Sequence, residues 1–113
     1  MRAMTDARVV FTTAADAAEA EKIGRALVER QLAACVNVLP QVRSIYRWQG
    51  KVEDAPEILL IIKTTGAQFP AVCDAIRELH SYDVPECICL PITDGSPDYL
   101  KWLAESVQPP PKP

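Results

Sequence analysis

The sequence lacks an excess of positive charge and contains a single histidine, His80. Its 113 residues include 12 lysines and arginines against 15 aspartates and glutamates, which gives a formal net charge of −3. Nucleic-acid-binding domains usually show a basic excess or a basic stripe, so we predict no nucleic-acid partner. The four cysteines form no Cys-x-x-Cys motif and no spaced Cys/His quartet, so the sequence does not predict a structural zinc site.

Long apolar runs are also missing. No stretch approaches the ~18 apolar residues that indicate a membrane span, so we predict no membrane partner. Val9–Phe11 is too short an apolar region for a signal peptide. We therefore expect a cytoplasmic protein with reduced thiols. The length predicts one domain with its own hydrophobic core.

The stretch from Val42 to Thr65 predicts two long strands joined by a tight turn at Gln49-Gly50-Lys51. Proline cannot donate a hydrogen bond to a strand ladder, so Pro56 predicts a bulge or an edge position in the second arm. A strand with one solvated face alternates between apolar and polar residues. Ile58–Ile62 are apolar throughout, which predicts a strand buried on both faces.

Three helices and three further strands are predicted in the rest of the chain. The helices are indicated by an acidic cap at Asp16 and by apolar residues at helical spacing over Phe69–Leu79 and Tyr99–Val107. The further strands are predicted over Arg8–Thr13, Ala34–Leu39 and Pro85–Ile92. We place the domain at residues 8–107, between a flexible N-terminus at 1–7 and a proline-rich tail at 108–113.

A weak internal repeat indicates how these elements are arranged. Thr12 and Thr64 precede the first two helices, Cys35 and Cys87 follow them, and both pairs are 52 residues apart (64 − 12 and 87 − 35). Two strand–helix–strand halves around a hairpin predict an α+β, ferredoxin-like split βαβ sandwich with both helices on one sheet face. The other face would expose apolar residues at a cost of ~1.5–3 kcal/mol each. We therefore expect an oligomer packed sheet to sheet, with the long hairpin reaching a neighbour.

Five motifs occur in order between about Val9 and Val107. They are Ala33-Ala34-Cys35-Val36-Asn37, Ser44-Ile45-Tyr46-Arg47-Trp48-Gln49-Gly50-Lys51, Ile62-Lys63-Thr64, His80-Ser81-Tyr82-Asp83-Val84-Pro85-Glu86 and Tyr99-Leu100-Lys101-Trp102. Together they resemble the CutA family of divalent-cation tolerance proteins. The resemblance implies a ferredoxin-like protomer with an extra C-terminal helix in a cytoplasmic homotrimer, similar in architecture to the PII signalling trimers. It also implies a non-enzymatic role in the response to copper and other divalent metal ions.

The proposed metal ligands of the family can be compared with the residues at the same places in this chain. Members with proposed copper ligands have a cysteine in the first strand and adjacent histidines at the end of the second helix. This chain has Thr12, Leu79 and His80 at those places, so His80 is the one metal ligand predicted. A lone imidazole implies weak binding of copper or another divalent metal, and this binding should fall as the pH drops through ~6.5. Cys35 is a soft-ligand candidate, although a cysteine in an apolar strand is more often a small buried hydrophobe.

A polar set supplies the remaining site candidates. Lys63, Tyr82 and Glu86 are predicted to line an inter-subunit cleft that holds a small anionic or metal-bound ligand. The alternative for these residues is an ion-paired trimer seam, and for Trp48 it is an interface core. Two functions stay open: a metal-binding, metal-responsive trimer, and a PII-like trimeric sensor of a small molecule. An enzyme is disfavoured because no nucleophile–base pair is evident around the one histidine.

Overall fold

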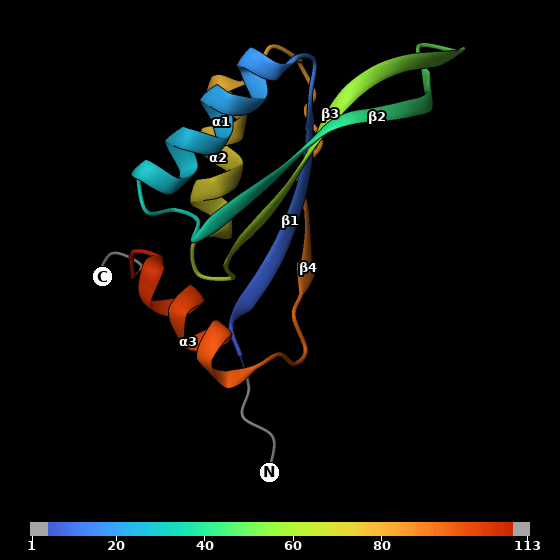
Figure 1. Cartoon of the computed structure of the whole chain (residues 1–113). Coiled ribbons are helices and arrows are strands. Elements are labelled where there is room, and N and C mark those ends of the chain that lie inside the picture. The colour runs from blue at the N-terminus through green and yellow to red at the C-terminus, as the bar shows by residue number, and fades with distance from the viewer. Residues whose placement is uncertain (1–4, 110–113) are drawn as a thin grey trace.

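The computed structural model describes residues 5–109, which form a four-stranded sheet and three helices (Figure 1). The elements are β1 (Ala7–Ala14), α1 (Ala17–Glu29), β2 (Cys35–Trp48), β3 (Lys51–Thr65), α2 (Phe69–Leu79), β4 (Ile88–Pro91) and α3 (Pro97–Ser106). The strand order is β2-β3-β1-β4 and every pair of neighbours is antiparallel. The α+β class, the long hairpin and the C-terminal helix predicted from the sequence are therefore confirmed.

The hairpin formed by β2 and β3 turns at Gln49 and Gly50, whose φ angles of 51° and 80° are both positive. Two such residues match the twist of the flanking strands, and Trp48 pairs directly with Lys51. The prediction of a separate strand ending at Leu39 was wrong, because β2 continues through Pro40 to the turn. The ladder accommodates the proline with a register shift between Leu39 and Val42.

Pro56 occupies the edge position that the sequence predicted. β1 pairs with β3 only from Ile58 to Thr65, so β3 has β2 as its one paired strand at Pro56. The bulge itself lies on the opposite strand, between Leu39 and Val42, which are paired with Leu59 and Glu57. β4 is shorter than predicted, because the segment before Ile88 leaves the sheet and Pro85 has no amide hydrogen to donate to a ladder.

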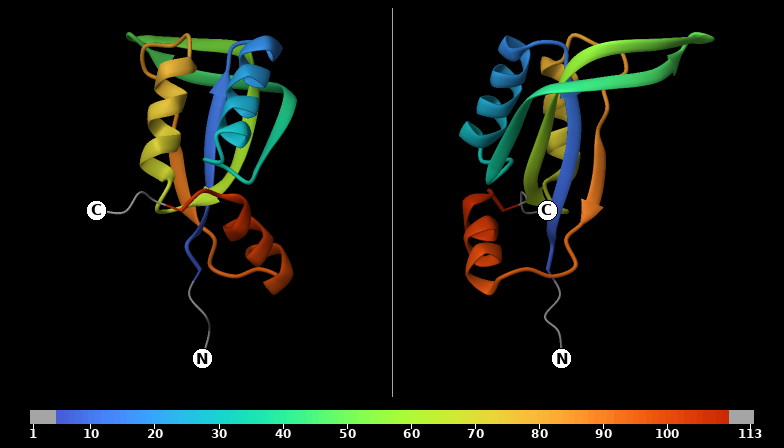
Figure 2. Two further views of the ribbon diagram at one scale, coloured as in Figure 1. Left: turned by 90° about the vertical axis from the view of Figure 1, so that its left-hand side faces the viewer. Right: turned by 45° about the vertical axis from the view of Figure 1, so that its right-hand side comes forward.

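The main core lies between α1, α2 and one face of the sheet, and Figure 2 shows both helices on that side. Alternation along β3 places Ile58, Leu60 and Ile62 in this core. Leu59 and Ile61 point to the opposite face and stay only half-buried. Within residues 5–109 no helix covers this second face, so burial of β3 on both faces would require a partner surface and stays a prediction.

Local contacts fix the ends of the elements. The Asp16 side chain caps α1 by accepting a hydrogen bond from the Glu19 amide. α3 packs through Leu103 on Ala7 in a second, smaller core near the start of β1. β1 begins at Ala7, while residues 1–4 and 110–113 of the predicted termini lie outside the described residues. Across residues 5–109, every helix is too short or too polar to cross a membrane.

Candidate functional site

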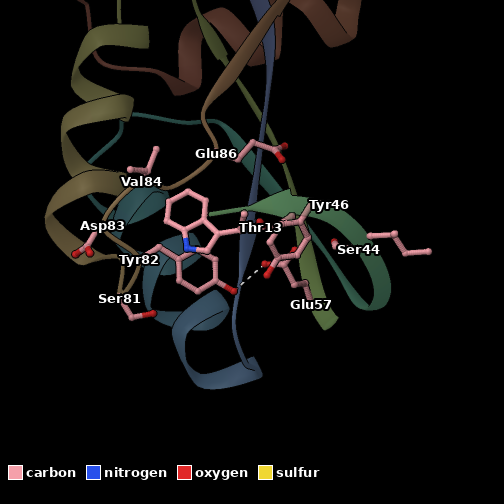
Figure 3. Close-up of a pocket in the computed structure, with 11 residues that line it drawn as sticks. Thr13, Ser44, Tyr46, Glu57, Ser81, Tyr82, Asp83, Val84 and Glu86 are labelled. Atoms are coloured by element: carbon pink, nitrogen blue, oxygen red, sulfur yellow. Dashed lines mark hydrogen bonds between the residues drawn. The ribbon is translucent and has the colours of Figure 1, made fainter. Parts of the chain in front are cut away.

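A pocket of about 680 Å³ lies beside the hairpin, on the sheet face without helices (Figure 3). We call it the hairpin–loop pocket. Its lining comes from β1 (Thr13), the hairpin (Ser44, Ile45, Tyr46, Trp48 and Glu57) and the loop after α2 (Ser81, Tyr82, Asp83, Val84 and Glu86). The register pairs Val42 with Glu57, so alternation from Val42 carries Tyr46 and Trp48 to the same face as Glu57.

The centre of the pocket is a hydrogen bond between Tyr82 and Glu57. The Tyr82 hydroxyl donates to Glu57 Oε2 over 2.7 Å, and Figure 3 shows the ring pointing toward the carboxylate. Glu57 is only 9% exposed although it lies on the sheet face that the helices leave bare. Burial, the hydrogen bond to Glu57 and its negative charge all raise the pKa of Tyr82. The phenol therefore stays neutral at physiological pH and acts as a hydrogen-bond donor.

The charge of the pocket is negative. Its lining includes Glu57, Asp83 and Glu86 but neither lysine nor arginine. Burial, followed by the nearby charge of Glu57, raises the pKa of Glu86. Lys63, one of the three predicted cleft residues, lies elsewhere on the open face and bonds to Asn37. The structure thus brings together Tyr82 and Glu86 but separates Lys63 from them, so an anionic ligand is disfavoured here.

His80, the predicted metal ligand, has a fully buried side chain. Its Nε2 donates to the Thr13 carbonyl oxygen over 2.6 Å, and its Nδ1 accepts from the Tyr82 amide over 3.0 Å. A carbonyl can only accept, so the Thr13 contact places a hydrogen on Nε2, and an amide can only donate, so the Tyr82 contact uses the Nδ1 lone pair. A metal ion would have to displace one of these two bonds. Copper binding at His80 therefore remains a prediction.

Glu19 of α1 holds the start of the pocket loop. Its carboxylate accepts from the amides of Ser81 and Ala15, and it lies 3.3 Å from His80 Nδ1. Burial alone would raise the pKa of Glu19, but these backbone hydrogen bonds outweigh burial and lower it. The helix layer is in this way connected through Glu19 and His80 to the loop on the other face.

The residues at the two other family ligand positions, Thr12 and Leu79, are part of the packed interior. Leu79 packs against the main core, and Thr12 is completely buried. Thr12 Oγ1 is the one buried side-chain polar atom without a hydrogen-bond partner in residues 5–109. Within the same residues, no three histidine, cysteine, aspartate or glutamate side chains are grouped to hold a metal ion. Cys35 lies half-buried on the open face with its sulfur 3.9 Å from Asn37 Oδ1.

Sequence reasoning missed Glu57 and Tyr46 as pocket residues. The signal for Glu57 was a carboxylate directly between Pro56 and five apolar residues, a place where a charged side chain needs a partner. The signal for Tyr46 was weaker, since its orientation depends on the bulge that resets the alternation of β2.

The comparisons with known proteins agree with this geometry. The family model described as "CutA1 divalent ion tolerance protein" matches residues 8–106. The chain belongs to the CutA1 family. It is 48% identical to the divalent-cation tolerance protein CutA of Thermus thermophilus over 98 residues, which cover 87% of this chain and 95% of that protein. The solved structure of the Thermus thermophilus CutA1 protein superimposes with a TM-score of 0.88 at 46% identity, over 90% of this chain and 99% of that one.

Vertebrate members of the CutA1 family are longer. The CutA homologue of Xenopus laevis is 48% identical over 97 residues, which are 86% of this chain but 64% of the relative. The chain spans 52% of the CutA protein of Mus musculus. The shared part is the domain that carries the hairpin–loop pocket.

Proposed function

We propose that this CutA1 protein acts without catalysis, as a cytoplasmic homotrimer, in the response to divalent cations. We also propose that the hairpin–loop pocket is its ligand site and takes a small, positively charged molecule. The observation that carries the second statement is the lining itself, which includes three carboxylates and three aromatic side chains but neither lysine nor arginine.

The assembly is supported by the open face of the sheet. Phe11, Leu59 and Ile61 lie there, together with Ile88 and Leu90, which are 51% and 46% exposed. Exposed apolar residues in one contiguous patch favour a partner surface. The strand order and the single helix layer suit a ferredoxin-like protomer, and the hairpin projects from the body of the protomer (Figure 1). A closed ring of such contacts gives a homotrimer resembling the PII trimers.

The assembly has a direct test in sedimentation. At micromolar concentration we expect a single trimeric species that resists dilution. A stable monomer under the same conditions would overturn the homotrimer and remove the reason for the apolar face.

The ligand class follows from the chemistry of the pocket. Glu57, Asp83 and Glu86 attract positive charge, and the rings of Tyr46, Trp48 and Tyr82 offer π faces to an organic cation. The neutral Tyr82 hydroxyl is held by Glu57 and adds no charge of its own. A bare divalent cation needs several oxygen ligands, so its direct binding would require ligands from more than one protomer. The PII-like sensor is accordingly favoured over a metal chelator within one chain.

Weak copper(II) binding at His80 is the competing candidate, and it requires the imidazole to leave Thr13 or Tyr82. The single histidine is also the one residue that could have served as a catalytic imidazole. With both ring nitrogens bound to the backbone it has no lone pair free for a substrate, which supports a function without catalysis.

Calorimetric titration of the trimer separates these candidates. The ligands are copper(II), zinc(II) and a set of small primary and quaternary amines. We expect an amine to bind and Glu57→Gln to weaken it at least tenfold, about 1.4 kcal/mol. Glu105→Gln, an exposed acidic position on α3, should change nothing. Equal amine binding by Glu57→Gln would refute the pocket, and copper(II) uptake lost only in His80→Ala would favour the metal site.

A further inference from the structure

Two cysteine thiols meet on the helix-covered side of the molecule. Cys73 belongs to α2, and Cys87 directly precedes β4. Their sulfur atoms are 2.7 Å apart, and both side chains are partly accessible to solvent. A disulfide has an S–S distance of about 2.03–2.05 Å, so the two residues could be joined by a small movement of the side chains. All four cysteines are free thiols in the structure.

The segment between these thiols contains the pocket loop. Starting from Cys73, the chain runs through the end of α2 and His80, then Ser81–Glu86, and returns at Cys87. Five residues of the hairpin–loop pocket are in this segment: Ser81, Tyr82, Asp83, Val84 and Glu86. A covalent bond between the two sulfurs would close a ring around the loop and tether both of its ends to α2.

We propose that Cys73 and Cys87 are a redox modification site, at which a reversible disulfide restrains the loop of the hairpin–loop pocket. The disulfide does not depend on the ligand proposed above, but its effect on ligand binding does. Cys87 packs against the core beneath the helices rather than on the open apolar face. A trimer assembled through the open face would therefore leave the thiol pair accessible.

The step is an exchange with a low-molecular-weight disulfide such as glutathione disulfide. Burial raises the pKa of Cys87 to about 12, and its contact with Cys73 adds to the increase, so Cys87 supplies little thiolate. We assign the first attack to Cys73, which forms a mixed disulfide while one glutathione leaves as thiolate and takes up the Cys73 proton. Cys87 then attacks the Cys73 sulfur, the second glutathione leaves as thiolate and takes up the Cys87 proton. The protein loses two electrons and two protons, and the oxidant becomes two thiols.

The test compares single-cysteine variants of the full chain. The purified protein is incubated with glutathione disulfide, after which free thiols are counted and intact mass and linked peptides are measured. We expect the loss of two of the four thiols, a mass lower by two hydrogen atoms, and a peptide linking Cys73 to Cys87. Dithiothreitol should restore all four thiols. Hydrogen exchange should slow in Ser81–Glu86 of the oxidised form.

The two remaining cysteines provide matched controls. Cys35→Ser and Cys89→Ser should each still lose two thiols and give the same linked peptide. Cys73→Ser and Cys87→Ser should form no internal disulfide. The proposal is overturned if the unmodified protein carries only glutathione adducts, if the linked peptide joins another pair, or if exchange in the loop is unchanged by oxidation. None of these results depends on whether an amine binds the pocket, so failure here and failure of the proposed ligand are distinguishable.

Discussion

The two faces of the sheet differ in what their side chains do. On the helix-covered face, Val10, Leu60 and Ile62 are completely buried in one continuous core. On the open face, Leu59 and Ile61 are half-buried, while Tyr82 and Glu57 meet in a polar pocket farther along the same surface. Stability within one chain therefore rests on the first face. The assembly and the ligand binding proposed above would use the second face, and alternation along β3 decides on which of the two faces each side chain lies.

The strongest test of this difference between the two faces is to truncate two adjacent leucines of β3. Leu60→Ala removes a fully buried side chain and should lower the free energy of unfolding by about 2–5 kcal/mol. Leu59→Ala makes the same chemical change on the open face. Its effect should act through assembly and thus vary with protein concentration. Urea denaturation at several concentrations measures both, and equal concentration-independent losses would contradict the division between faces.

A second change tests whether the hairpin belongs to the assembly. Trp48 lines the pocket and is 47% exposed in one chain. Trp48→Ala should weaken the trimer by roughly 2 kcal/mol or more if the indole fills an interface pocket of a neighbour. Sedimentation over a dilution series gives the answer. A variant that stays trimeric with unchanged thermal stability would exclude the interface role and leave Trp48 with its proposed ligand role alone.

Glu19 connects the helix layer to the pocket loop, and its contribution to folding stability can be measured by varying the pH. Because its folded-state pKa is lowered from 4.5, the carboxylate stabilises the protein above that value, and this stabilisation is lost as pH falls through the folded pKa. Glu19→Gln should cost about 1 kcal/mol at neutral pH and flatten the stability profile below 4.5. Glu21→Gln, at an exposed position of the same helix, is the control. Parallel pH profiles for Glu19→Gln and the unmodified protein would contradict this role.

The smallest effect is expected at Thr12, a completely buried polar residue on the helix-covered face. Its buried hydroxyl has no partner among the described residues, so replacing it with the isosteric valine removes a group that gains nothing from the fold. Thr12→Val should leave thermal stability unchanged or raise it by up to about 1 kcal/mol. A clear loss of stability would show that the hydroxyl has a partner, such as a bound water.

Much of the fold could be predicted from local patterns in the sequence. Asp16 marked the start of a helix, Gly50 a turn, and the 52-residue repeat the relation of the two halves (64 − 12 and 87 − 35). The continuity of β2 could not be predicted, because Pro40 normally ends a strand and nothing local indicates that the bulge absorbs it. Local sequence patterns therefore do not predict how two strands are aligned when their pairing register depends on a bulge.

The candidate site was only partly predictable for the same reason. Tyr82 and Glu86 lie in one short loop, so their proximity follows from the sequence. Lys63 lies on the open face as well, but it is six residues beyond Glu57 along β3 and bonds to Asn37 instead. The burial of His80 depends on the carbonyl of Thr13, 67 residues away, and a backbone oxygen leaves no signature in the sequence.

The bulge between Leu39 and Val42 determines which side chains of the outer hairpin lie on each face of the sheet. Two residues of β2 stand there opposite one of β3, so beyond it even-numbered residues of β2 take the side that odd-numbered residues held before. If the two strands paired without the bulge and the sequence were unchanged, Gln41 would stand opposite Glu57, and Arg43 and Arg47 would face the pocket in place of Tyr46 and Trp48. Deleting Gln41, by contrast, would remove the bulge together with its extra residue and leave Tyr46 and Trp48 on the face of Glu57. The bulge therefore decides whether this surface carries aromatic rings or guanidinium groups.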